Sequence, residues 1–116
     1  MKGKNVIQEK SFNFALSIIE LYKILLQKKE YVISKQILRS ATSIGANIEE
    51  ATAAQSKKDF AYKMSISSKE ARETRYWLRL LDKSQLVKFD YSQYIKDSTE
   101  IIRILTSIVK TAQKNS

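Results

Sequence analysis

The chain has 116 residues, and its 21 Lys and Arg against 12 Asp and Glu give a net charge of +9. It contains no Cys, His or Pro and only two Gly. This excludes zinc fingers, Cys nucleophiles and Ser-His-Asp triads, and it argues against an all-β chain rich in tight turns. Hydrophobic residues make up 43% of the chain, too many for a disordered basic tail. The composition therefore indicates one small, basic, helical domain over residues 1–116.

Apolar and small residues recur at spacings of three and four in four segments, which indicates four amphipathic helices. The pattern predicts helices over residues 7–28, 34–54, 57–84 and 92–113. Ser34 is the predicted N-cap of the second helix, and Ser56 begins a capping box with Asp59 at the start of the third. The predicted core positions are Ile7, Phe14, Ile18, Leu21, Leu25, Ile37, Ala41, Ile44, Ile48, Ala51, Phe60, Met64, Ser67, Ala71, Thr74, Leu78, Leu81, Ile95, Ser98, Ile102, Leu105, Ile108, Val109 and Ala112.

The connections between these segments are short, so consecutive helices are expected to be antiparallel. The predicted fold is all-α, an antiparallel up-down-up-down four-helix bundle. The second helix carries an unusual run of small residues, which should let a neighbouring helix come very close. A close contact would compensate for Gly45, which costs about 1 kcal/mol relative to Ala inside a helix.

The positive charge is concentrated in the third helix, since residues 55–88 carry +5 of the total +9. Clustered arginines suit phosphate, because the guanidinium offers forked donors. This indicates a nucleic-acid-binding stripe that contacts RNA or DNA. The alternative is a solvated or intra-oligomer face in a Lys-rich protein. The stripe consists of Lys69, Arg72, Arg79 and Lys83 on a single face, with Arg75 one step aside.

Hairpin geometry predicts a buried polar network between the second and third helices. If the chain turns near residue 55, Arg39 lies within one turn of Glu70 and Glu73. This predicts an ion pair at the seam, the line along which the second and third helices meet. Asn47 is disfavoured inside a helix. We expect its side chain to find a partner on another helix or in another subunit, because Met64, at the same height, cannot serve.

Two aromatic residues, Tyr76 and Trp77, lie beside the apolar stripe of the third helix rather than on it. A large aromatic pair at the edge of a bundle is a natural oligomer contact. The alternative is bundle-edge packing with a hydrogen-bonded tip.

Catalysis is not expected from this sequence. A di-iron bundle needs Glu-x-x-His on two helices, and the chain has no His. An all-carboxylate magnesium site could draw on residues 49–50, 70–73 and 97–100, but Lys69, Arg72 and Arg75 crowd the same stretch. The serines of the second and third helices have no His partner and are interpreted as small packing residues. We therefore expect no enzyme activity, cofactor, metal or small-molecule substrate.

No stretch of about 20 uncharged apolar residues exists, so no transmembrane helix or membrane partner is expected. The basic residues at the start of the chain are not followed by an apolar signal core. A cytoplasmic location is the expectation.

Two motifs in the middle of the chain resemble a known family. Residues 36–50 read Q-x-x-R-S-x-x-S-I-x-x-N-I-x-E, and residues 69–78 read K-E-x-x-E-x-x-Y-W-L. Together they resemble the bacterial four-helix-bundle family of proteins encoded in 23S rRNA intervening sequences. The accessory variability determinant of diversity-generating retroelements is distantly similar. The similarity covers residues 14–86.

The resemblance implies a homopentameric four-helix bundle with nucleic-acid binding and no catalytic residues. Many family members have Gly where this chain has Ala51, so the second helix is expected to extend to about Ala54. The expected function is a homo-oligomeric module that binds RNA or DNA non-specifically through a basic surface. The alternative is a protein-interaction scaffold without direct nucleic-acid contact. By this resemblance, Arg39, Ser43, Asn47 and Glu50 match the family's second-helix motif, and Glu70 and Glu73 match its third-helix motif.

Overall fold

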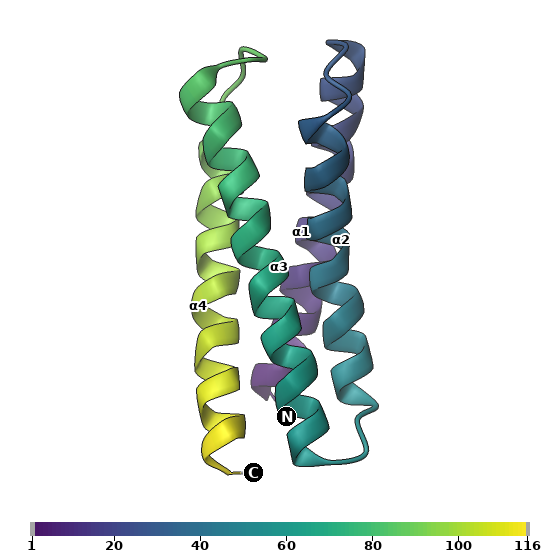
Figure 1. The fold of residues 1–116 in the computed structure, drawn as a ribbon, viewed down its shortest axis with the longest axis vertical. Helices are drawn as coiled ribbons and strands as arrows, with labels where there is room; N and C mark the ends of the chain where they lie inside the picture. Colours follow the sequence, from purple (N-terminus) through teal and green to yellow (C-terminus); the bar gives the residue numbers. More distant parts are fainter. Residues whose placement is uncertain (1, 116) are drawn as a thin grey trace.

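The computed structural model of the chain describes the backbone of residues 2–115 and the side chains of residues 6–115. Over these residues the chain forms four helices, α1 (Lys2–Gln27), α2 (Ile33–Thr52), α3 (Lys57–Ser84) and α4 (Ser92–Lys114). They pack as an antiparallel up-down-up-down bundle with extents of 45 × 21 × 21 Å, in which α1 neighbours α2 and α4 (Figure 1). The all-α four-helix fold expected from the sequence is confirmed.

The helix bounds differ from the predicted ones at several ends. α1 begins at Lys2 instead of residue 7, and α4 continues one residue further, to Lys114. α2 ends at Thr52, so the predicted extension to Ala54 is wrong. The reason is visible in the backbone, because the N–H groups of Ala53 and Ala54 bond three residues back instead of four. This tighter turn ends the helix despite the absence of a glycine at position 51.

The start of α2 is capped by Glu30, and the prediction that Ser34 is its N-cap is wrong. The buried Glu30 carboxylate accepts the backbone N–H groups of Val32 at 3.0 Å, Ile33 at 3.0 Å and Ser34 at 2.6 Å. Ser34 lies inside the helix and its hydroxyl donates to the Glu30 carbonyl oxygen. One long side chain therefore satisfies three donors that the helix itself leaves without partners.

The start of α3 has the Ser56 half of the predicted capping box. The Ser56 side chain accepts the backbone N–H of Asp59 at 3.0 Å, and Ser56 has the extended backbone of an N-cap.

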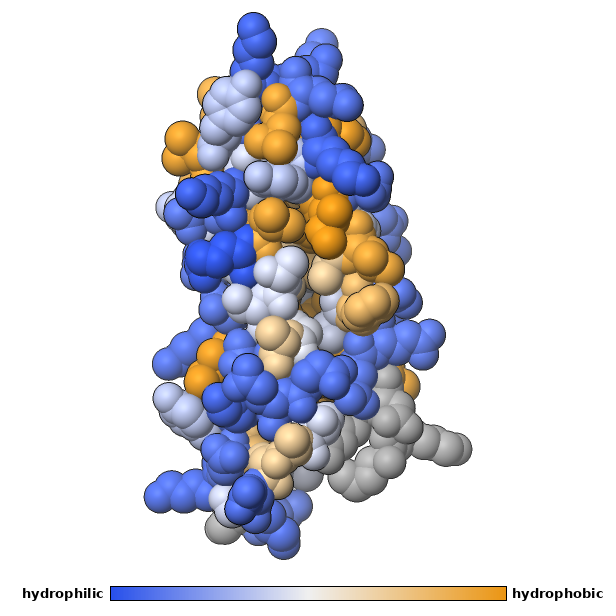
Figure 2. All heavy atoms as spheres, turned by 90° about the vertical axis from the view of Figure 1, so that its right-hand side faces the viewer, coloured by the Kyte–Doolittle hydropathy of each residue, from blue (hydrophilic) through white to orange (hydrophobic). Residues whose placement is uncertain are grey.

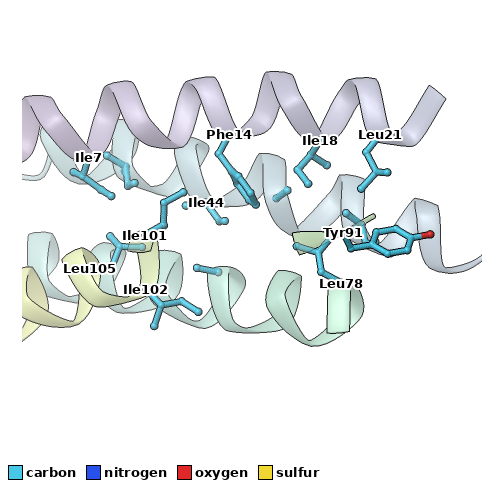
Figure 3. Close-up of a cluster of buried hydrophobic side chains, with 14 of the residues drawn as sticks. Ile7, Phe14, Ile18, Leu21, Ile44, Leu78, Tyr91, Ile101, Ile102 and Leu105 are labelled. Atoms are coloured by element: carbon cyan, nitrogen blue, oxygen red, sulfur yellow. The ribbon is translucent and has the colours of Figure 1, made fainter. Parts of the chain in front are cut away.

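The core runs the length of the bundle, with apolar side chains of α1 facing those of α4 (Figure 3). Most predicted core positions are buried, but those towards the ends of the stripes of α3 and α4 are only half-buried. Tyr91 is fully buried although it was not among the predicted positions, and its hydroxyl donates to the Val87 carbonyl at 2.7 Å. The half-buried positions are Phe60, Ile95, Ile108, Val109 and Ala112.

Small polar residues hold α2 and α3 in register. The buried Ser67 hydroxyl donates across the seam to the Ile44 carbonyl at 2.8 Å. The buried hydroxyls of Thr74 and Ser40 share a hydrogen bond of 2.7 Å. The interpretation of Ser40 and Ser67 as packing residues alone was therefore incomplete, because each also makes a bond between helices. These two bonds fix the position of α3 along α2.

Candidate nucleic-acid interface

The predicted basic stripe of α3 runs along the exposed side of that helix, and at Arg72 it borders α4. Arg72 Nη2 donates to the Thr106 hydroxyl of α4 at 3.1 Å. Arg75 is half-buried, while the other four cations of the stripe, Lys69, Arg72, Arg79 and Lys83, are exposed. The structure thus places the predicted nucleic-acid-binding residues together along one edge of the bundle.

A second row of cations runs along α4 beside the first. Arg103 precedes Thr106 by three residues and Lys110 follows it by four, so both lie next to Thr106 on the exposed surface of α4. Lys96 extends the row at a spacing of seven, and all three side chains are exposed. The two rows together form what we call the basic face: Lys69, Arg72, Arg75, Arg79, Lys83, Lys96, Arg103 and Lys110.

Sequence reasoning missed the α4 row because residues 89–116 carry a net charge of only +1. The nearby carboxylate of Glu100 cancels part of this charge, since it interacts electrostatically with Arg103 and Lys96 as well as with α1. Glu100 forms an ion pair with Lys10 of α1, and this hydrogen bond lowers the pKa of Glu100. Asp97 and Glu100 both line a hollow between α1 and α4. The seven-residue spacing of the α4 cations was the available signal.

The predicted ion pair between α2 and α3 is present, but it lies at the rim of the seam. Arg39 contacts Glu73, and its Nη1 lies 3.5 Å from Glu70 Oε1. The Arg39 side chain is 48% exposed, so the expectation of a buried pair is wrong. The hydrogen bond to Glu73 raises the pKa of Arg39. The hydrogen bond from Trp77, together with Arg39, lowers the pKa of Glu73 despite partial burial.

Asn47 makes its hydrogen bond within its own helix. Its Nδ2 donates to the Ser43 carbonyl at 2.8 Å, one turn earlier in α2. The expectation that Asn47 needs a partner on another helix is therefore wrong, because a carbonyl four residues back lies within reach of a short amide side chain.

The two aromatic residues have different surroundings. Trp77 is half-buried against the core, and its Nε1 donates to Glu73 Oε2 at 2.9 Å. This arrangement matches the alternative of bundle-edge packing with a hydrogen-bonded tip. Tyr76 is 56% exposed and meets the Trp77 ring edge-on at 5.2 Å between centroids. A contact of Tyr76 with another subunit stays a prediction.

The acidic pairs weighed as a magnesium site do not converge. Glu50 pairs with Lys63 at 2.8 Å, while Glu73 and Glu100 have the cationic partners given above. Within residues 6–115 we find no group of three Asp or Glu side chains arranged to hold a metal ion. The four helices, as far as they are described, include none with an apolar stretch that could cross a membrane.

The comparisons with known proteins agree on one family. Residues 3–107 match the family described as 23S rRNA-intervening sequence protein. A solved structure of a protein of unknown function from the S23 ribosomal protein family of Bacteroides thetaiotaomicron has 52% sequence identity and a TM-score of 0.87, with 93% of this chain and 98% of that one covered. No curated protein matches the chain. Because the matched region covers most of the chain and reaches into α4, the chain belongs to the family of 23S rRNA-intervening sequence proteins.

Proposed function

We propose that this protein is a non-enzymatic, homo-oligomeric module of the cytoplasm that binds RNA or DNA through the basic face. The observation that carries the proposal is the sorting of charge on α3 and α4. Eight cations form two neighbouring rows, whereas Glu70 and Glu73 are turned to α2 and Glu100 to α1.

Electrostatics favours a polyanion as the partner of this face. Like charges at one-turn spacing, such as Arg75 with Arg79 and Arg79 with Lys83, repel by a few tenths of a kcal/mol each. Bound phosphates reduce that repulsion. Binding also releases the counterions of the nucleic acid, so the affinity should fall steeply with salt. The chain shows no sequence motif typical of base-specific readout, which supports contacts to phosphate.

Self-association would multiply the effect of one basic face, since linked copies bind with higher effective affinity. The opposite side of the bundle offers a contact surface. Phe12 and Leu16 of α1 are 65% and 49% exposed. Figure 2 shows hydrophobic residues across the face formed by α1 and α2. Several exposed apolar side chains on one face are typical of an interaction site, and we propose that a second copy covers this one.

The test is RNA binding at several salt concentrations, measured by fluorescence anisotropy. The variant Arg72→Ala/Arg75→Ala/Arg79→Ala should bind more weakly, and its salt slope should fall by about 2. Lys23→Ala/Lys28→Ala/Lys35→Ala removes the same charge from other exposed positions and should have a smaller effect. Equal affinities and slopes for the two variants would remove the assignment of the basic face.

The apolar α1–α2 face also supports the second candidate, a protein-interaction scaffold. Light scattering on the purified protein distinguishes the two. A mass of several subunits that falls to one subunit in Phe12→Ser/Leu16→Ser supports self-association. A monomeric wild type, together with a protein partner retained after nuclease treatment, supports the scaffold instead.

A further inference from the structure

The outer ridge of α3 carries two tyrosines among a row of cations. Its positions follow one another at spacings of four and three residues, so they lie along one face of the helix. Tyr62 and Tyr76 are 62% and 56% exposed. The ridge contains no acidic residue and consists of Lys58, Tyr62, Ser65, Lys69, Arg72, Tyr76, Arg79 and Lys83.

Each tyrosine has a cation one turn away. Arg72 precedes Tyr76 by four residues and Arg79 follows it by three, so both lie beside its ring. Lys58 stands in the same relation to Tyr62. Tyr76 is also braced, since the half-buried Trp77 packs edge-on against it at 5.2 Å between ring centroids. A braced aromatic ring loses little conformational freedom when a ligand stacks on it.

We infer that Tyr62 and Tyr76 are stacking platforms for the bases of a single-stranded nucleic acid whose phosphates lie along the cations of this ridge. The inference rests on the proposed function and names the class of nucleic acid. Cations alone accept the phosphates of duplex and single strand alike. Exposed tyrosines add affinity only for a single strand, because the bases of a duplex are stacked on one another.

The spacing of the platforms sets a length requirement. Tyr62 and Tyr76 are 14 residues apart, which corresponds to about 21 Å along the helix axis. An oligonucleotide too short to span that distance reaches only one of them. The affinity should therefore rise in a step within a length series of oligothymidylates, and Tyr62→Ala should abolish the step.

The experiment measures anisotropy of labelled oligothymidylate and of an equally charged DNA duplex. Tyr62→Ala and Tyr76→Ala should each weaken binding of the single strand by about tenfold and leave the duplex unchanged. Tyrosine-to-phenylalanine variants should retain wild-type affinity. Tyr31→Ala is the matched control, because Tyr31 is 60% exposed and lies outside the ridge, between α1 and α2.

A second measurement compares the wild-type protein with the double variant Tyr62→Ala/Tyr76→Ala. An abasic strand of the same length keeps the phosphates but has no bases, so it should bind about as weakly as oligothymidylate binds the double tyrosine variant. Two outcomes would overturn the stacking inference alone. The first is equal affinity of the wild-type protein for the abasic strand and for oligothymidylate. The second is that the tyrosine substitutions have no effect while Arg72→Ala/Arg75→Ala/Arg79→Ala still weakens binding. Failure of the wild-type protein to bind any of the probes would overturn the proposed function with it.

Discussion

Arg72 of α3 donates to the hydroxyl of Thr106 of α4 at 3.1 Å, and this contact joins two helices that each carry a row of cations. Four residues after Thr106 stands Lys110, and three before it stands Arg103, both exposed. The basic face is thus a property of the pair of helices and not of α3 alone. This distinction can be tested by changing α4 while leaving every arginine of α3 in place.

The first prediction concerns that α4 row. Arg103→Ala/Lys110→Ala should weaken RNA binding and lower the salt slope by about 1.4 to 1.8, because each cation that neutralises a phosphate contributes about 0.7 to 0.9. Salt titrations by anisotropy check this, with Lys28→Ala/Lys35→Ala as the equally charged control. An unchanged slope in the α4 variant would confine the interface to α3.

The second prediction concerns the ion pair between Arg39 and Glu73. Both side chains are more than a third exposed, so a double-mutant cycle of Arg39→Met and Glu73→Gln should show a coupling of under about 1 kcal/mol in unfolding free energy. Urea unfolding followed by Trp77 fluorescence provides the measurement. A coupling indistinguishable from zero would mean that the pair does not contribute to stability.

The third prediction is the pH dependence of the same site. The pKa of Glu73 is lowered in the folded protein by Trp77 and Arg39. The ionised Glu73 side chain therefore contributes to folding stability above the unfolded pKa of a glutamate, about 4.3. This contribution is lost as the pH falls through the lower folded pKa. Wild type and Glu73→Gln should differ in stability at pH 7 and converge at low pH. Glu49→Gln, the same change at an exposed carboxylate of α2, serves as the control. A difference in stability between wild type and Glu73→Gln that grows on acidification would contradict the assignment.

The fourth prediction concerns the buried hydrogen bond between Thr74 and Ser40. Thr74→Val keeps the shape but leaves the Ser40 hydroxyl without this partner, so unfolding free energy should fall by about 1 to 3 kcal/mol. Adding Ser40→Ala should recover part of the loss, because both polar groups are then gone. Denaturant unfolding of the two single variants and the double variant measures this; strictly additive losses would show that the two hydroxyls are not coupled.

The fifth prediction concerns Gly45, for which the run of small residues in the second helix suggested a close approach by a neighbouring helix. A Cβ built at Gly45 would meet the Ser11 hydroxyl at 3.4 Å, an ordinary contact. Gly45→Ala should therefore stabilise the protein by up to about 1 kcal/mol through helix propensity. The reverse change at the exposed neighbour, Ala46→Gly, should destabilise it by a similar amount. Loss of stability in Gly45→Ala, measured by thermal unfolding, would show that α1 packs more tightly here than ordinary contact.

The sequence by itself determined the helices and most of the core. Periodicity at 3.6 residues is a local property, so the stripes of Ile18, Ile44 and Leu78 could be recognised without knowing what they pack against. The capping box at Ser56 is equally local. Hairpin geometry also predicted the pairing of Arg39 with Glu73, since a short turn fixes which residues of two consecutive helices lie level.

The tertiary structure decided which charges share a face. A sum along the chain merges Lys96, Arg103 and Lys110 with the nearby acids, although Glu100 is paired with Lys10 of α1 and α4 contacts Arg72 of α3 through Thr106. It also decided that Glu30 caps α2, because a long side chain can reach donors that local preference assigns to Ser34. The shared face depends on the rotation and register of each helix against its neighbours, which packing of the whole core sets, whereas the Glu30 cap depends on the conformation of the turn before α2.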